Sequence, residues 1–170
     1  MNFLDWLGLT QAHASVNVGD PAPDAASRDQ DGQAVRLAEL YGNGLALVYF
    51  YPKADTPGCT AQACSLRDSF AGLQDRGVRV IGVSSDSPAA QKRFAEKYRL
   101  PFTLLADEDH AVANAFGVRL LLGMTHRQAF LIKDGRVIWR DLSASTREHA
   151  RDVLHFLANS AETGSPNGSA

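Results

Sequence analysis

The stretch LALVYFY at residues 45–51 decides the fold. An unbroken apolar run of this length and bulk predicts a strand that is buried on both faces, as in the centre of a sheet. The loop PKADTPG at residues 52–58 leaves this strand and delivers Cys59 to the start of a predicted helix. The placement of that cysteine is the most informative feature of the chain.

Strands and helices alternate outward from this point. From Thr60 to about Arg76 apolar residues recur every three or four positions, up to Gly77, which predicts a helix. The pattern further predicts strands over 78–83 and 102–105, helices over 88–99 and 109–116, a hairpin of strands 128–132 and 137–139, and a last helix from Thr146 to Leu157. This order predicts an α/β fold with a central mixed sheet flanked by helices on both faces.

The two ends of the chain differ from its middle in composition. The turn-rich residues 19–23 set apart an N-terminal extension, residues 1–17, in which Phe3, Trp6 and Leu7 share one helical face. A short amphipathic helix and a floppy leader are both open for this extension. One domain is expected over residues 18–158, and the Gly- and Ser-rich end predicts a disordered tail over residues 159–170.

Length and composition exclude several classes of protein. The chain has 170 residues, of which 45% are hydrophobic and 21% charged, and these values fit one globular domain. A net charge of −2 provides no basic field to hold nucleic acid or an anionic membrane. We expect neither a membrane span nor a secretory signal, because no apolar run or flanking charge has the required pattern. Two cysteines are too few for a disulfide scaffold, so a cytoplasmic location is expected.

Cys59 stands where a helix N-terminus favours an anion. The unpaired N–H groups of the first turn and the positive end of the helix dipole stabilise a thiolate at this position. Position alone leaves a second interpretation open, in which Cys59 is a buried and inert core residue.

Further residues around Cys59 complete a known pattern. Pro52, Thr56 and Cys59 form a P-x-x-x-T-x-x-C motif, Cys64 follows at C-x4-C spacing, and THRQAFLI occupies residues 125–132. Through these motifs the chain resembles the peroxiredoxins, in their bacterioferritin comigratory protein (peroxiredoxin Q) branch, from about residue 18 to 157. The resemblance implies a thioredoxin-like fold.

The resemblance also implies a role for five residues. Cys59 would be the peroxidatic cysteine, which attacks a peroxide oxygen and becomes a sulfenic acid, and Cys64 the resolving cysteine, which forms a disulfide with it. Thr56 would hydrogen-bond the thiolate and the peroxide, Pro52 would shield the site from water, and Arg127 would place its guanidinium beside the sulfur. The implied substrates are hydrogen peroxide and organic hydroperoxides, and the implied reductant is a thioredoxin-like dithiol protein. No metal or organic cofactor is implied, and we expect a monomer or a weak dimer.

Thiolate formation alone cannot explain a fast peroxidase. Lowering a cysteine pKa from about 8.5 to about 6 raises the thiolate fraction at pH 7 roughly thirtyfold. The same change lowers the nucleophilicity about thirteenfold at a Brønsted coefficient near 0.45, so the net gain is about twofold. Most of the acceleration must therefore come from donors aimed at the peroxide oxygens, such as Thr56, the loop N–H groups and Arg127.

The spacing of the two cysteines sets a geometric problem. On an α-helix, Cα atoms five residues apart are roughly 8.6 Å from each other, whereas a disulfide tolerates at most about 7 Å. The helix must unwind locally if Cys59 and Cys64 pair. The alternative for Cys64 is a small core residue.

Two other functions are open for a chain of this fold. A thiol–disulfide oxidoreductase carries C-x-x-C at a helix start, which the C-x4-C spacing does not provide. A redox-sensing binding protein or holdase could use helix unwinding to expose an apolar face. The combination of Thr56, Cys59 and Arg127 argues against binding as the sole role.

The remaining polar residues near these motifs are interpreted as structural. Asp86 is expected to cap the helix that follows Pro88 or the turn before it, and the histidines, including His126 and His149, show no metal-ligand spacing. Gln62 stands where many relatives carry a glutamate and receives no role.

Two segments depart from the pattern of the branch. Residues 25–28, with the sequence AASR, lack the expected aromatic and alternating apolar residues, which weakens the packing of a first hairpin. The loop at residues 119–124 is short and apolar, and it is expected to line the approach to the site or to contact a partner.

Overall fold

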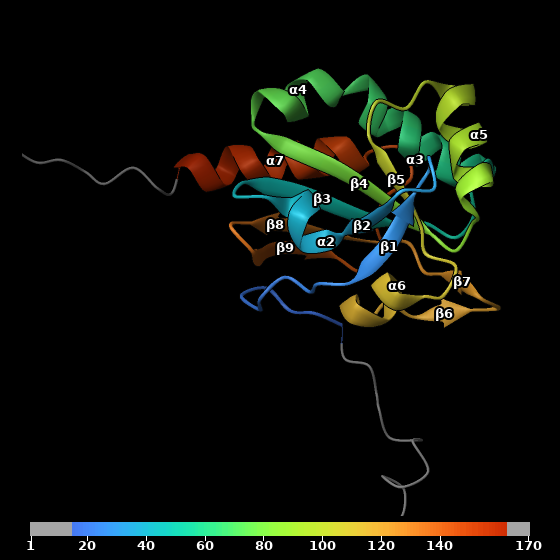
Figure 1. Ribbon diagram of the computed structural model, residues 1–170. Helices are drawn as coiled ribbons and strands as arrows, with labels where there is room; N and C mark the ends of the chain where they lie inside the picture. Colours follow the sequence, from blue (N-terminus) through green and yellow to red (C-terminus); the bar gives the residue numbers. More distant parts are fainter. Residues whose placement is uncertain (1–14, 163–170) are drawn as a thin grey trace, which may run out of the picture.

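The structure, a computed structural model, describes residues 15–162 and contains a mixed sheet of seven strands in the order β2-β1-β5-β4-β3-β8-β9 (Figure 1). The strands of this sheet are β1 (Ala26–Asp29), β2 (Ala34–Arg36), β3 (Leu45–Phe50), β4 (Val78–Ser84), β5 (Thr103–Ala106), β8 (Gln128–Lys133) and β9 (Arg136–Asp141). The three strands β3, β4 and β5 are parallel, whereas β8 runs antiparallel to β3 and β1 antiparallel to β5.

Helices cover both faces of the sheet, as the sequence predicted (Figure 1). One face is covered by α3 (Pro57–Asp68), α4 (Phe70–Asp75), α5 (Pro88–Tyr98) and α7 (His149–Glu162), and the other by α2 (Leu37–Tyr41) and α6 (Ala111–Phe116). Alternate residues of β3 belong to the two cores: Leu47 and Tyr49 to the first, Val48 and Phe50 to the second. Burial on both faces explains why β3 is apolar at every position.

Two predicted helices have boundaries that differ from the prediction. The helix expected from Thr60 to about Arg76 starts at Pro57 and is divided at Ser69, where a bend brings Phe70 of α4 to 6.1 Å from the ring of Phe102. Packing against the sheet therefore overrides the continuous helical pattern.

The last helix begins at His149 rather than at Thr146, because a turn precedes it in which the N–H of Glu148 donates to Ser145 Oγ (3.1 Å). It runs to Glu162, four residues past the expected domain end at 158, since the chain has no helix-breaking residue before Gly164. The part of the predicted tail at residues 159–162 is thus helical. The remainder, residues 163–170, lies outside the described residues.

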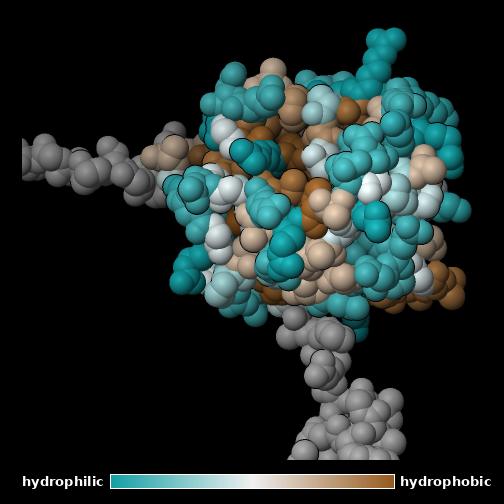
Figure 2. All heavy atoms as spheres, in the orientation of Figure 1, coloured by the Kyte–Doolittle hydropathy of each residue, from teal (hydrophilic) through white to brown (hydrophobic). Residues whose placement is uncertain are grey.

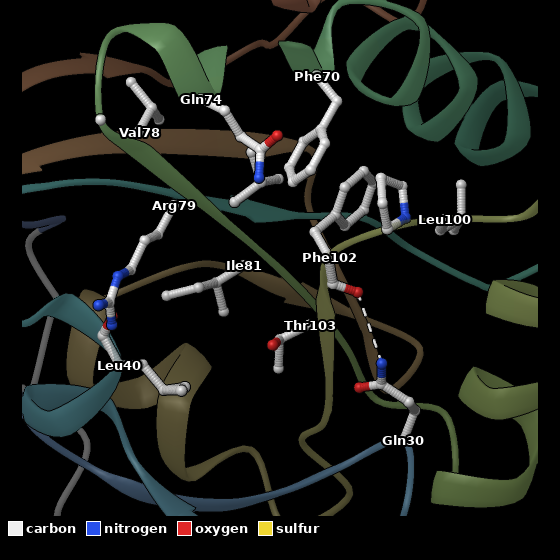
Figure 3. A pocket seen from close by; sticks show the side chains of 13 residues that line it. Gln30, Leu40, Phe70, Gln74, Val78, Arg79, Ile81, Leu100, Phe102 and Thr103 are labelled. Atoms are coloured by element: carbon white, nitrogen blue, oxygen red, sulfur yellow. Dashed lines mark hydrogen bonds between the residues drawn. The ribbon is translucent and has the colours of Figure 1, made fainter.

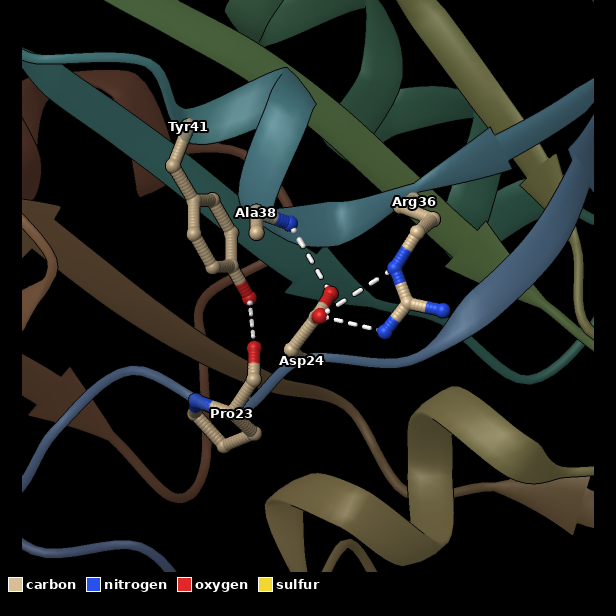
Figure 4. Close-up of polar contacts among 5 residues, drawn as sticks. All are labelled: Pro23, Asp24, Arg36, Ala38 and Tyr41. Atoms are coloured by element: carbon tan, nitrogen blue, oxygen red, sulfur yellow. Dashed lines mark hydrogen bonds and ion pairs between the residues drawn. The ribbon is translucent and has the colours of Figure 1, made fainter.

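The hairpin of β1 and β2 lacks the apolar pattern expected for it, and polar contacts secure it instead (Figure 4). One carboxylate oxygen of Asp24 accepts from the guanidinium of Arg36 (2.5 Å), and the other accepts from the N–H of Ala38 (3.1 Å). The hydroxyl of Tyr41 donates to the carbonyl of Pro23 (2.8 Å). Asp24 therefore ties the segment before β1 to the start of α2.

The apolar loop at residues 119–124 contains a small hairpin of its own, β6 (Leu120–Leu121) and β7 (Met124–Thr125). Leu121 is 62% exposed and Leu122, at the turn, 89% exposed. Hydrophobic spheres stand at the lower right edge of Figure 2, where this hairpin lies. The hairpin is an exposed apolar projection.

At the N-terminal side, the described chain is already bound to the domain at Val16, whose N–H donates to the carbonyl of Phe116 (3.1 Å). The amphipathic helix considered for the extension, with Phe3, Trp6 and Leu7, lies outside the described residues. None of the helices within residues 15–162 is long and apolar enough to cross a membrane.

Candidate active site

Cys59 lies in the first turn of α3, directly after the loop that leaves β3. One residue beyond β3, the N–H of Tyr51 still donates to the carbonyl of Val83 in β4 (3.0 Å). The helix starts with Pro57, and its first helical hydrogen bond runs from the N–H of Thr60 to the carbonyl of Thr56 (2.8 Å). The N–H groups of Gly58 and Cys59 consequently have no partner within the helix and form an anion-binding end.

The loop before Cys59 is fixed to α5 and β4 at two neighbouring residues. Asp55 has a left-handed backbone (φ 60°), and its carboxylate accepts from Lys97 Nζ (2.9 Å) and from the hydroxyl of Tyr98 (2.8 Å). The hydrogen bond from Lys97 lowers the pKa of Asp55. The preceding N–H, of Ala54, donates to the carboxylate of Asp86 (2.8 Å). These contacts set the path of the chain into α3.

Of the two roles predicted for Asp86, capping of the following helix is wrong. Ser87 is the N-cap of α5, where its hydroxyl oxygen accepts from the N–H of Ala90 (3.2 Å). The carboxylate of Asp86 is already engaged, because the hydroxyl of Ser84 donates to it (2.6 Å) in addition to Ala54. Asp86 therefore connects the active-site loop to β4.

The guanidinium of Arg127 lies beside the sulfur of Cys59. The distance from Arg127 Nη2 to Cys59 Sγ is 3.4 Å, and Cys59 is only 1% exposed. The sheet register explains the proximity, because β8 pairs Gln128 with Phe50, which places Arg127 next to the end of β3. A Cβ atom at Gly58 would lie 3.1 Å from Nη2, so the glycine leaves room for the guanidinium.

Gln62 is a fully buried partner of Arg127, although the sequence analysis gave it no role. It is 0% exposed on α3, and its Oε1 accepts from Arg127 Nη1 (2.5 Å). Its Nε2 lies 2.7 Å from Nδ1 of His149, the first residue of α7. A chain of hydrogen bonds therefore connects α7 through Gln62 and Arg127 to the sulfur of Cys59.

His149 is neutral in this environment. Burial, and to a smaller extent the positive charge of Arg127, lowers the pKa of His149 to about 4. Its ring meets that of Tyr49 edge to face, with centroids 5.8 Å apart and an interplanar angle of 82°. A sequence signal for His149 existed, because it shares the buried face of its helix with Val153 and Leu157.

Comparisons with known proteins agree with this geometry. The AhpC/TSA family matches the chain over residues 18–140. Peroxiredoxin Bcp from Escherichia coli (strain K12) is 46% identical to it over 154 residues, which cover 86% of this chain and 98% of that protein. The chain belongs to the AhpC/TSA family.

Solved structures place this peroxiredoxin in the same branch. Peroxidoxin BcpB from Mycobacterium tuberculosis is 36% identical, with a TM-score of 0.79 over 85% of this chain and 97% of that one. The bacterioferritin comigratory protein of Xanthomonas campestris, studied for its alkyl peroxide reduction activity, is 27% identical, with a TM-score of 0.73 over 81% of this chain and 92% of that one. The thioredoxin-like fold and the thiol peroxidase function predicted from the sequence are thereby confirmed.

Of the five residues to which the sequence assigned roles, the structure brings Cys59 and Arg127 into contact. The hydroxyl of Thr56, the N-cap of α3, donates to the carbonyl of Lys53 (2.7 Å) and not to the sulfur of Cys59. Cys64 is half-buried on α3 and, like Cys59, a free thiol in this structure of the peroxiredoxin.

Pro52, half-buried, follows the last residue of the buried stretch and begins the active-site loop. Within residues 15–162, no group of three or more His, Cys, Asp or Glu side chains is arranged to hold a metal ion.

A hollow lined by both apolar and polar side chains lies away from this site, at the other end of β3 and β4. Figure 3 shows its lining residues. Phe70, Leu100 and Phe102 line it over the first half of β4, which starts opposite the beginning of β3, whereas Cys59 follows the end of β3. No cysteine or histidine lines this hollow. This hollow therefore provides no thiol that could react with a peroxide.

The pKa of His149 predicts a loss of stability of the peroxiredoxin in acid. Between an unfolded pKa of about 6.5 and the folded value of about 4, the unfolded chain binds a proton that the folded protein excludes, so stability falls as the pH falls. This contribution to the free energy of unfolding is roughly 3 kcal/mol and is complete above about pH 6.5. The variant His149→Asn does not titrate and should lose less stability between pH 7 and pH 4.5 in urea unfolding.

The control is His155→Asn, a change at an exposed position of the same helix, which should lose stability in acid as the wild type does. Equal acid dependence of His149→Asn and the wild type would contradict a neutral, buried His149.

Proposed function

We propose that Cys59 is the peroxidatic cysteine and that Arg127 supplies the charge that stabilises its reaction. The contact of 3.4 Å between Arg127 Nη2 and Cys59 Sγ, at the N-terminus of α3, carries this assignment. The thiolate attacks one peroxide oxygen and the O–O bond breaks. Cys59 becomes a sulfenic acid, and the other oxygen takes up a proton and leaves as water or an alcohol.

Negative charge moves from the sulfur to the leaving oxygen during this step. The guanidinium of Arg127 contacts the sulfur, and the N–H groups of Gly58 and Cys59 are unpaired donors in the same first turn of α3, so all of them are available to stabilise that charge. A buried site strengthens the effect, because few water molecules screen the interaction. These donors supply the acceleration that a higher thiolate fraction cannot.

Thr56 acts as an acceptor in this proposal. Its hydroxyl hydrogen is used in the bond to Lys53, which leaves only the lone pairs of its oxygen. An oxygen in this state accepts the hydrogen of a peroxide O–H and thereby orients the substrate. Pro52, at the start of the same loop, limits the access of water to Cys59.

Cys64 is the resolving cysteine. Its thiol attacks the sulfenic sulfur of Cys59, the S–O bond breaks and water leaves, which gives an intramolecular disulfide. Because the two residues are too far apart on an intact helix, the first turns of α3 unwind for this step. Gln62 lies between them in the sequence and must therefore leave Arg127 and His149 when the disulfide forms.

The disulfide is returned to two thiols by exchange with a thioredoxin-like dithiol protein, which is oxidised in turn. Hydrogen peroxide and organic hydroperoxides are the proposed substrates, and the alkyl peroxide reduction activity associated with the Xanthomonas campestris relative supports the second class. A cytoplasmic location and a monomeric or weakly dimeric state remain predictions.

The two cysteines should respond differently to substitution. Cys59→Ser should abolish peroxide consumption, whereas Cys64→Ser should complete one turnover and stop as a sulfenic acid that is open to over-oxidation. Mass spectrometry after one equivalent of peroxide in the presence of dimedone separates the two cases. A dimedone adduct on Cys64 in the Cys59→Ser protein, together with rapid loss of peroxide, would contradict the assignment.

Oxidation should unwind the start of α3. Amide hydrogen exchange in residues 60–68 is expected to rise when the Cys59–Cys64 disulfide forms, because the helical distance exceeds the reach of a disulfide. Exchange in α5 serves as the control and should not change. Equal protection of α3 in both redox states, with the disulfide verified by mass, would rule out this mechanism.

A further inference from the structure

The buried amide of Gln62 lies between two partners, Arg127 at its oxygen and His149 at its nitrogen. Arg127 Nη1 is 2.5 Å from Oε1 of Gln62, and His149 Nδ1 is 2.7 Å from Nε2. Gln62 is 0% exposed, so water does not compete for either end of the amide.

The chemistry of Arg127 fixes the direction of this amide. A guanidinium has N–H donors and no acceptor, so the atom of Gln62 that faces it must be the oxygen. The NH₂ group then faces His149, whose Nδ1 must accept and cannot carry a proton. His149 is consequently the neutral tautomer with its proton on Nε2.

Without an acceptor on His149, Gln62 would have no satisfied orientation. With its oxygen on Arg127, its buried NH₂ would lack a partner, and with the amide turned over, the NH₂ would face the positive guanidinium. The lone pair of Nδ1 is the only acceptor for this NH₂ among the hydrogen bonds of the described residues. Nδ1 of His149 therefore favours the orientation of the Gln62 amide in which its oxygen faces Arg127.

The other nitrogen of His149 supports a role for Nδ1. Nε2 is buried and has no hydrogen-bond partner among the described residues. A purely apolar side chain would fill this place against Tyr49 without an unpaired N–H, so packing alone does not favour a histidine. What a histidine adds at this position is the acceptor that meets Gln62.

We propose that His149 is a positioning residue of the peroxidase: its neutral Nδ1 orients the amide of Gln62, and the amide oxygen holds the Arg127 guanidinium against the sulfur of Cys59. His149 itself does not reach the sulfur and acts through two other side chains. The proposal rests on the proposed function of Cys59 and Arg127.

Two variants, His149→Asn and His149→Leu, test whether the acceptor at Nδ1 of His149 is needed. Asn and Leu have the same branched outline, but only Asn carries an oxygen that can take the place of Nδ1. The second-order rate constant for oxidation of Cys59 by hydrogen peroxide should fall about tenfold in His149→Leu, by analogy with the loss of a hydrogen-bond partner behind a metal ligand. In His149→Asn it should stay closer to the wild-type value than to that of His149→Leu.

A rescue experiment separates positioning from folding. Gln62→Glu has two acceptor oxygens and no NH₂, so it can hold Arg127 without an acceptor on His149. Combined with His149→Leu, it should restore the rate toward that of Gln62→Glu alone, although it restores no packing around residue 149. If His149→Leu does not fold, His149→Phe, which keeps an aromatic ring against Tyr49, replaces it in both comparisons.

The proposal is overturned if the leucine variant reacts as fast as the wild type, if the asparagine variant is as slow as the leucine variant, or if Gln62→Glu rescues nothing. Failure of the proposed function would look different, because the wild type itself would then not form a sulfenic acid with one equivalent of peroxide.

Discussion

The contact between the Arg127 guanidinium and the Cys59 sulfur is the interaction on which the rest of the site depends. A positive charge can rest in a closed site only if its remaining donors find acceptors, and Gln62 provides one from inside α3. Space is provided by Gly58, where any side chain would push against the guanidinium. The position of α3 itself follows from the loop contacts of Asp55 and Asp86.

The same contacts limit what the site can do after it has reacted. Gln62 joins Arg127 and His149 only while α3 is folded, and a disulfide between Cys59 and Cys64 requires that α3 unwinds at this point. The arrangement that accelerates attack on peroxide must be broken before Cys59 can be regenerated. The stability of the first turns of α3 therefore balances the oxidation step against the resolving step.

The sequence was sufficient for features that depend on local pattern. The run at residues 45–51 identified the central strand because burial on both faces requires apolar residues at every position, and the P-x-x-x-T-x-x-C motif located the loop and the cysteine. The division of the helix at Ser69 could not be predicted, because it follows from packing against Phe102, which is distant in sequence. Gln62 and His149 were missed for a similar reason. The apolar face around His149 indicates that it is buried but does not identify its partner, and the roles of both residues arise only where α3 meets α7 beside Arg127.

The most direct test of this account is the pH dependence of Cys59 oxidation in Arg127→Met. Arg76→Met, an exposed change after α4 that removes the same charge, is the control and should react as the wild type does. If Arg127 stabilises the transition state, its loss should slow oxidation by roughly 100- to 1000-fold, by analogy with an oxyanion-hole donor. The defect should persist on the high-pH plateau, where the thiol is fully ionised. Recovery of the wild-type rate at high pH would show that Arg127 acts only through ionisation of the cysteine and would contradict the account.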